Sequence, residues 1–157
     1  MTARWVLYAA ITVTAGVMGT NIYNSVIDAP SWGASIPQSL EVARQYFSTG
    51  TPGRFFRVAS PLAQGLMLLA LIVCWKYGPA IRGLAAAALA FVILADVLTF
   101  VYFYPRNDIM FVNILDAEAA TRAWRGWSTM THIRSAMACA AVVCELMVLS
   151  RIEQLSR

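Results

Sequence analysis

The sequence contains few charged residues and a single histidine. Charged residues make up 13% of its 157 residues, against roughly 25% in an ordinary soluble domain, while apolar residues make up 59%. A soluble protein of this composition could not cover its surface with polar groups, whereas a lipid bilayer needs no such cover. The net charge of +4 provides no continuous basic face, so a nucleic-acid partner is not expected.

Cysteine and histidine are too sparse for the common metal centres. The three cysteines form no CxxC pair, which argues against a zinc or thioredoxin-like site and favours buried small apolar residues. One histidine, His132, cannot form a multi-histidine haem, copper or zinc site. A mixed site that uses His132, Asp96 and Asp108 stays open, but the sequence indicates no cofactor.

Four apolar stretches are long enough to cross a bilayer, which takes about 20 residues. A membrane span must satisfy its backbone polar groups internally, so these stretches are predicted to be helices. The expected spans are Trp5 to Ile27, Val58 to Tyr77, Gly83 to Tyr104 and Trp127 to Ser150. The predicted fold class is therefore all-α, with one domain that forms a four-helix transmembrane bundle.

The connections between the spans predict the topology. A tight turn, Lys76–Arg82, joins the second and third spans, whereas the first and third connections are long and lie on the opposite side. Four spans place both termini on the side of the turn. Basic residues are denser in the short segments of that side, which predicts cytoplasmic termini in a bacterial plasma membrane.

The long connections also carry local signals. Pro37–Phe47 has apolar residues along one side and is expected to form a short amphipathic helix in the membrane interface. The run Ser48–Gly53 then breaks this helix. In the third connection Asp116 is expected to cap a helix, in which Glu118 and Arg122 have the spacing of an i, i+4 pair.

Polar residues of all four spans share one depth, roughly 5–12 Å below the long-loop boundary at about 1.5 Å per residue. They are Asn21, Asn24, Gln64, Asp96 and Arg134. Charges that face lipid are costly, so Asp96 and Arg134 are expected to point inward and to pair. The pair could fix helix register, or the layer could form a polar pocket that opens to the long-loop side. Intramembrane ionisable residues are functional candidates, which favours the pocket.

The fourth span presents one inward stripe, at alternating spacings of four and three residues. Its members are Trp127, Thr131, Arg134, Ala138, Ala141 and Glu145. Glu145 lies far from the polar layer and is expected to snorkel or to make an inter-helix contact. His132 lies on the neighbouring stripe, and its imidazole makes it a candidate general base, with a structural histidine as the alternative.

The third span is expected to end at Pro105, because proline cannot continue a helix. The following residues, Asn107 and Asp108, would then lie at the mouth of the pocket. An ordinary capped turn is the alternative, since asparagine and aspartate commonly serve that purpose.

Three stretches carry a family resemblance. They are Gly19-Thr20-Asn21-Ile22-Tyr23-Asn24 with Pro30-Ser31-Trp32, then Tyr104-Pro105-Arg106-Asn107-Asp108, and finally Arg125 to Arg134. Together they resemble the anthrone-oxygenase-like family of small four-helix membrane proteins. In that family a tryptophan, a polar residue four positions on and an arginine three further recur, and Trp127, Thr131 and Arg134 match this spacing. The usual polar residue is asparagine or histidine, so Thr131 with His132 beside it is a departure.

The resemblance implies an oxidoreductase or oxygenase that oxidises a lipophilic aromatic or quinone-like molecule with molecular oxygen. It implies that His132 or Asp96 removes an acidic proton and that Arg134 with Asn107 stabilises the resulting anion. The candidate substrate-binding residues are Asn21, Asn24, Gln64, Asn107, Trp127 and Thr131.

A non-catalytic membrane protein is the alternative, either binding a lipophile or supporting a membrane complex. The expected partners are membrane lipid and a lipophilic small molecule, and a homo-oligomer stays open. Solute transport is the weaker third hypothesis, because four spans form a pathway only with a partner or a second copy.

Overall fold

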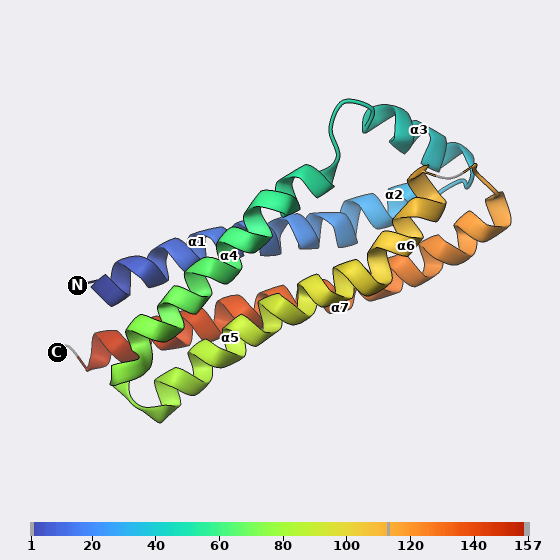
Figure 1. Cartoon of the computed structure of the whole chain (residues 1–157). Helices are drawn as coiled ribbons and strands as arrows, with labels where there is room; N and C mark the ends of the chain where they lie inside the picture. Colours follow the sequence, from blue (N-terminus) through green and yellow to red (C-terminus); the bar gives the residue numbers. More distant parts are fainter. Residues whose placement is uncertain (1, 113, 156–157) are drawn as a thin grey trace.

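The computed structural model describes residues 2–112 and 114–155 and consists of long helices (Figure 1). The described residues contain no β-strand. Four helical runs are long and apolar enough to cross a membrane: Ala3–Gly33, Pro52–Tyr77, Pro79–Val112 and Ala117–Gln154. The predicted all-α four-helix membrane bundle is therefore confirmed.

Each run combines one long helix with shorter helical turns. The elements in chain order are α1 (Thr2–Tyr23), η1 (Asn24–Asp28), α2 (Ala29–Gly33), α3 (Gln38–Tyr46), α4 (Pro52–Cys74), η2 (Trp75–Tyr77), α5 (Pro79–Leu98), η3 (Thr99–Phe103), α6 (Tyr104–Asn107), η4 (Asp108–Val112) and α7 (Ala117–Gln154). The turns η1, η3 and η4 are π-helical, and η2 is a 3-10 turn.

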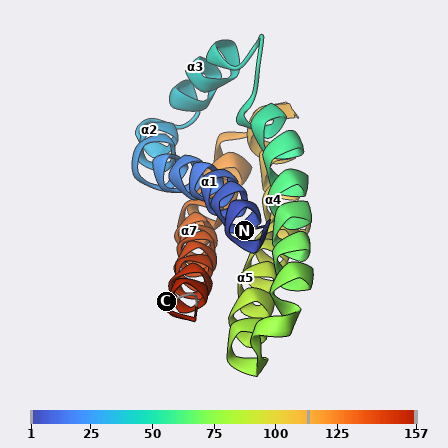
Figure 2. The ribbon, with the colours of Figure 1, turned by 90° about the vertical axis from the view of Figure 1, so that its left-hand side faces the viewer.

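The four long helices form a closed ring. Helix α1 packs against α4 and α7, and α5 packs against the same two helices (Figure 2). Both termini lie at the end of the bundle that carries the α4–α5 turn, which we call the terminal end (Figure 1). Helices α2, α3 and α6 lie at the opposite end, the loop end (Figure 1). This arrangement agrees with the expectation that both termini share one side with the tight turn.

The tight turn at the terminal end depends on one glycine. Gly78 has a φ of 102°, a backbone conformation that glycine adopts without steric cost. Pro79 then takes the first turn of α5, where the missing N–H costs no helical hydrogen bond. The two residues together reverse the chain within a few positions.

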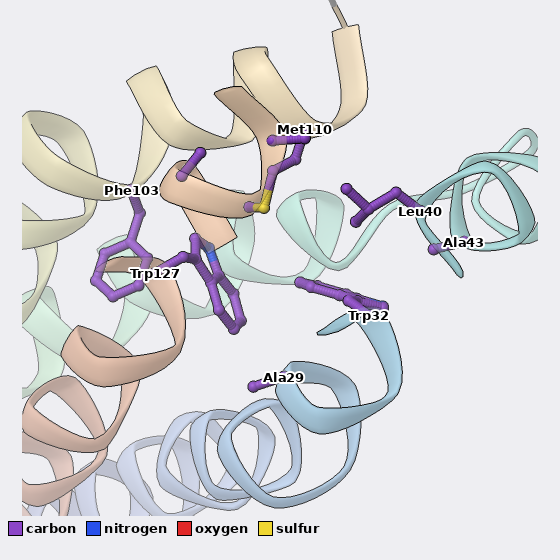
Figure 3. Packing of buried hydrophobic residues seen from close by; sticks show 9 residues of the cluster. Ala29, Trp32, Leu40, Ala43, Phe103, Met110 and Trp127 are labelled. Carbon is purple, nitrogen blue, oxygen red and sulfur yellow. The ribbon is translucent and has the colours of Figure 1, made fainter. Parts of the chain in front are cut away.

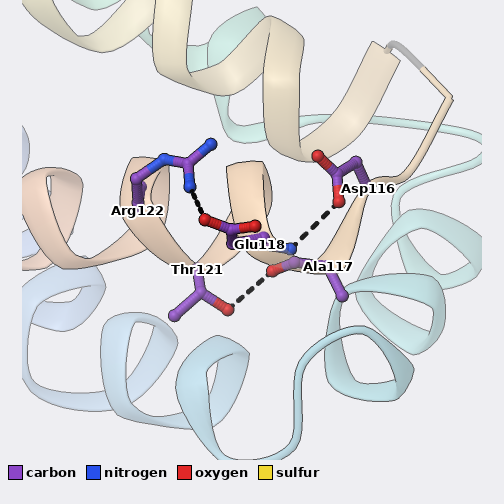
Figure 4. Close-up of polar contacts among 5 residues, drawn as sticks. All are labelled: Asp116, Ala117, Glu118, Thr121 and Arg122. Carbon is purple, nitrogen blue, oxygen red and sulfur yellow. Dashed lines mark hydrogen bonds and ion pairs between the residues drawn. The ribbon is translucent and has the colours of Figure 1, made fainter.

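The predicted local structure of the loop end is largely confirmed. The amphipathic segment forms α3, with Leu40 and Ala43 buried, and the break after it precedes α4. Asp116 caps α7 by accepting a hydrogen bond from the backbone N–H of Glu118 (Figure 4). Glu118 and Arg122 form the expected i, i+4 ion pair on the exposed surface (Figure 4).

The prediction that Pro105 ends the third span is wrong. The chain remains helical through η3, α6 and η4 to Val112, and Pro105 occupies the first turn of α6. The π-helical turn η3, which ends two residues before Pro105, shifts the backbone hydrogen bonds of the helix by one residue. The N–H that Pro105 lacks therefore falls at the start of α6, where it needs no helical partner. Pro30 follows the π-helical turn η1 in the same way.

Helix α7 also begins earlier than the sequence suggests, at Ala117 rather than near Trp127. The additional turns pack against α2, where Trp124 Nε1 donates a 2.7 Å hydrogen bond to the carbonyl of Ala29. Hydropathy identifies the part of a helix that lies in lipid, whereas packing at the loop end extends this helix beyond it.

Candidate intramembrane site

A small cavity lies between α1, α4, α5 and α7, at the depth of the predicted polar layer. Its volume is about 30 Å³, room for about two water-sized groups. The lining residues come from all four helices and are Thr14, Val17, Asn21, Phe56, Ser60, Ala63, Val92, Ala95, Asp96, Thr99, Arg134 and Ala138. Three of the five residues of the predicted polar layer, Asn21, Asp96 and Arg134, thus line one cavity.

Asp96 faces this cavity from α5 and is held by α4. The side-chain amide of Gln64 donates a hydrogen bond of 2.5 Å to Asp96 Oδ2. The hydroxyl of Ser60, one helical turn earlier on α4, faces the same carboxylate. The carboxylate is therefore oriented by two uncharged groups.

Asp96 and Arg134 do not form the expected direct pair. In residues 2–112 and 114–155 the direct ion pair is Arg122 with Glu118, at the surface. The carboxylate and the guanidinium instead line the same cavity from α5 and α7, and they interact electrostatically across it. An opening between two opposite charges is a place where a polar ligand group can bind.

Arg134 is buried, with 6% of its surface exposed, yet its hydrogen bonds are long. Nη1 donates to Thr99 Oγ1 at 3.5 Å and Nη2 to Thr131 Oγ1 at 3.4 Å. The guanidinium lies 4.1 Å from the centre of the Phe103 ring and 5.7 Å from that of Phe56. Aromatic faces stabilise a buried cation, but they offer no acceptor to Nε, which has no hydrogen-bond partner among the described residues.

Three buried polar atoms at the site have no hydrogen-bond partner in the described part of the chain: Arg134 Nε, Asn21 Oδ1 and Trp127 Nε1. Each such atom costs about 1–3 kcal/mol when it stays unpaired. Two of them donate and one accepts. A ligand oxygen that both donates and accepts, such as a hydroxyl, could satisfy Asn21 and Arg134 together from within the cavity.

An aromatic cluster lies at the loop end of the bundle (Figure 3). It reaches the site through Phe103, whose ring contacts the Arg134 guanidinium. The Trp127 ring contacts Phe103 edge-on at 5.6 Å between centroids and lies 4.9 Å from the Trp32 ring. Leu40 of α3 and Met110 complete the buried side of this cluster (Figure 3). Helix α3 therefore forms part of the wall between the cavity and the surface at the loop end.

Serine hydroxyls fix α7 against the first helical run. Ser25 Oγ and Ser135 Oγ are 2.7 Å apart, and Ser25 also donates to the backbone carbonyl of Asn21. A longer contact of 3.4 Å joins Ser25 to Thr131 Oγ1. These bonds set the register that holds Asn21 opposite Arg134.

The structure brings together some of the predicted site residues. Asn21, Asp96 and Arg134 line the cavity. Gln64 and Thr131 contact the two charged residues through hydrogen bonds. The stripe predicted on the fourth span is buried along its whole length, from Trp127 to Glu145.

Other predicted residues lie outside the cavity. His132 is exposed on the outer face of α7 and does not join Asp96 and Arg134. Asn107 is half-buried in α6 and Asp108 is exposed in η4, and neither lines the cavity. Asn24 is buried at the start of η1 but lies outside the lining. Of the two residues predicted as a general base, Asp96 lines the cavity together with Arg134, and His132 does not.

Sequence reasoning missed the hydroxyls that surround the charges. Thr14, Ser60 and Thr99 line the cavity, although single hydroxyls in apolar helices usually bond their own backbone, as Thr99 does with Ala95. The spacing of two of these hydroxyl residues along the chain could have identified them. Ser60 precedes Gln64 by four residues and Thr99 follows Asp96 by three, so each shares a helix face with a predicted site residue.

Glu145 is fully buried toward the terminal end, with 0% of its surface exposed. Thr14 Oγ1 of α1 donates a 2.8 Å hydrogen bond to Glu145 Oε1. The expected inter-helix contact is therefore confirmed, whereas the alternative of a snorkelling side chain is wrong.

Metal-ligating side chains do not gather in the described residues: no group of three or more His, Cys, Asp or Glu could hold an ion there. Comparison of the chain with family models, with curated proteins and with solved structures found no match. The resemblance to the anthrone-oxygenase-like family thus stays a prediction from the motifs.

Proposed function

We propose that this membrane protein is an oxidoreductase that binds the oxygen-bearing end of a lipophilic aromatic or quinone-like molecule between its four helices. The observation that carries the proposal is the unpaired state of Arg134 Nε and Asn21 Oδ1 on one cavity. A buried guanidinium without a carboxylate partner costs several kcal/mol. An electron-rich ligand oxygen would recover part of that free energy.

The cavity size limits how such a ligand binds. A space of about 30 Å³ admits a carbonyl or hydroxyl group but not a ring system. The half-buried Phe56 side chain forms part of the lining and must move to admit the rings. Substrate entry from lipid through α4, which carries Phe56, is therefore part of the proposal.

The chemistry follows from the two charges. Asp96 removes a proton from a carbon that is made acidic by a ring carbonyl, and the Arg134 guanidinium stabilises the resulting enolate oxygen. Molecular oxygen is the oxidant: the ring methylene becomes a carbonyl, and the second oxygen atom leaves as water with the two hydrogens of that carbon. The family resemblance supplies this reaction class.

The proposed location is a bacterial plasma membrane with cytoplasmic termini. Arg4, Lys76, Arg82 and Arg151 lie in short segments at the terminal end. Their density supports this orientation, which would place the site nearer the outer face.

A non-catalytic lipophile-binding protein is the second candidate. It is favoured by the exposed position of His132, which leaves one base instead of two near Arg134. A binding protein needs the unpaired Nε of Arg134 but not the carboxylate of Asp96. The two candidates therefore differ in their dependence on Asp96.

The test compares binding with turnover in nanodiscs, with anthrone as the probe. Quenching of tryptophan fluorescence reports binding, and oxygen consumption reports turnover. The oxidoreductase predicts that Asp96→Asn binds anthrone and consumes no oxygen. Binding without oxygen consumption by the wild type would favour the second candidate. Absence of anthrone binding by the wild type would reject both candidates.

A further inference from the structure

The buried carboxyl of Glu145 takes no part in the proposed oxidation. Its Oε1 accepts one hydrogen bond from Thr14, and its Oε2 has no partner in residues 2–112 and 114–155. A carboxylate with one hydrogen bond in the hydrocarbon region is costly, whereas the neutral acid is not. The surroundings therefore favour a bound proton on Glu145.

No cation among the described residues lies within ion-pair distance of this carboxyl. Arg134 lies eleven residues earlier on α7, roughly 16 Å along the helix axis. The titratable groups on the helices around it include Arg4 and Tyr8 on α1, Cys74 on α4, Arg82 and Asp96 on α5, and Cys144 and Arg151 on α7. None of these arginines forms an ion pair with Glu145. Tyr8 is exposed and bonds to Glu153, and Cys74 is buried in an apolar cluster. Glu145 thus has no charged partner that would hold it ionised.

Thr14 connects Glu145 to the cavity. The same side chain lines the cavity and donates to Glu145 Oε1. A threonine hydroxyl has one donor and two acceptor positions. It can therefore accept a proton from a water in the cavity while it passes its own hydrogen to the carboxylate.

We propose that Glu145 is a proton-binding site that exchanges its proton with the cavity through the hydroxyl of Thr14. In the loading direction, a hydronium ion in the cavity transfers a proton to Thr14 Oγ1, and the original hydroxyl hydrogen moves to Glu145. The products are a carboxylic acid and a water molecule, and the hydroxyl is restored by rotation. Release is the reverse step.

The proton path does not continue from Glu145 to the terminal end. Between Glu145 and that end lies a buried apolar cluster, whose members include Leu7, Ala70, Ile81, Val148 and Ile152. An apolar cluster of this kind carries no chain of donors and acceptors for a proton. The exchange is therefore one-sided, and Glu145 stores a proton for the cavity rather than passing it across the membrane.

When Glu145 gives a proton to the cavity or takes one from it, the charge of the cavity changes by one unit. The total charge of the membrane interior stays the same, because the proton only moves within it. Such a store serves any ligand that gains or loses a proton beside Asp96. The proposal stands without the oxidation, because it concerns the carboxyl and not turnover.

The test is infrared spectroscopy of the protein in nanodiscs at neutral pH. We expect a carbonyl band of a protonated carboxylic acid, which moves when all glutamates carry a ¹³C carboxyl label and disappears in Glu145→Gln. The label identifies a glutamate in the wild-type chain, so this result does not depend on how the variant folds. The carbonyl band of a protonated Asp96 would not shift with this label, because the label is confined to glutamate.

Hydrogen–deuterium exchange of the same band tests the path. Transfer into D2O should shift the band rapidly in the wild type and about tenfold more slowly in Thr14→Val. Thr12→Val is the matched control, because Thr12 is exposed on α1 and bonds the Tyr8 carbonyl. Absence of a protonated glutamate band at neutral pH would overturn the proton site. Equal exchange rates in Thr14→Val and Thr12→Val would overturn the path through Thr14.

Discussion

The guanidinium of Arg134 lies 4.1 Å from the centre of the Phe103 ring, whereas no direct ion pair joins it to Asp96 within the described residues. A desolvated cation–π contact is worth about 2 kcal/mol, less than the several kcal/mol that burial of a charge costs. The aromatic face therefore holds the cation without satisfying it. This imbalance is the basis of the first prediction.

Replacing Arg134 by methionine should weaken ligand binding without unfolding the protein. Arg134→Met removes an unpaired buried charge and keeps an apolar stem, so the melting temperature should stay equal or rise. Loss of a charged hydrogen bond of about 2 kcal/mol should raise the Kd for anthrone roughly thirtyfold. Thermal unfolding and fluorescence titration measure the two effects. Arg125→Met, at an exposed position on α7, is the control, and a large fall in melting temperature specific to Arg134→Met would show a structural role.

The carboxylate of Asp96 should matter for turnover and not for folding. Asp96→Asn keeps the shape and an acceptor for the Gln64 amide, so stability should change little. Loss of a general base should lower kcat about a hundredfold or more. Oxygen consumption with anthrone measures the change. Asp108→Asn, an exposed acid of η4, should retain full turnover, and equal losses in both variants would contradict the assignment.

His132 should be dispensable. Its side chain is exposed on the outer face of α7, away from the cavity. His132→Gln should therefore bind and oxidise anthrone within about twofold of wild type, since surface substitutions change free energies by about 0.5 kcal/mol or less. The same two assays apply. A loss of turnover as large as that in Asp96→Asn would instead identify His132 as the general base.

Gly33 is required for the close approach of α2 to α7. A Cβ at this position would lie 1.9 Å from Trp124 Cζ2, and that ring is fixed by its hydrogen bond to Ala29. Gly33→Ala should destabilise the protein by about 1–3 kcal/mol through overpacking. Gly16→Ala, with no atom within 4 Å of the added carbon, should leave stability unchanged or raise it. Melting temperatures in detergent compare the pair, and equal values would contradict the packing argument.

Some of the candidate site could be predicted because lipid imposes strict rules on polar residues. Asp96 and Arg134 had to face inward, and the spacing from Trp127 to Glu145 placed one stripe of α7 in the interior. The distance between the two charges could not be predicted. It depends on the separation of α5 and α7 and on the ring of Phe103, which binds one side of the guanidinium.

The sequence itself determined four features: the number of spans, the shared side of the termini, the cap at Asp116 and the short helix α3. Each depends on hydropathy or on contacts between residues close in the chain. Tertiary structure alone decided that His132 points outward, that the helix continues through Pro105 and that Thr14 joins the cavity to Glu145. These features depend on which faces of separate helices meet, and residues far apart in the chain set that geometry.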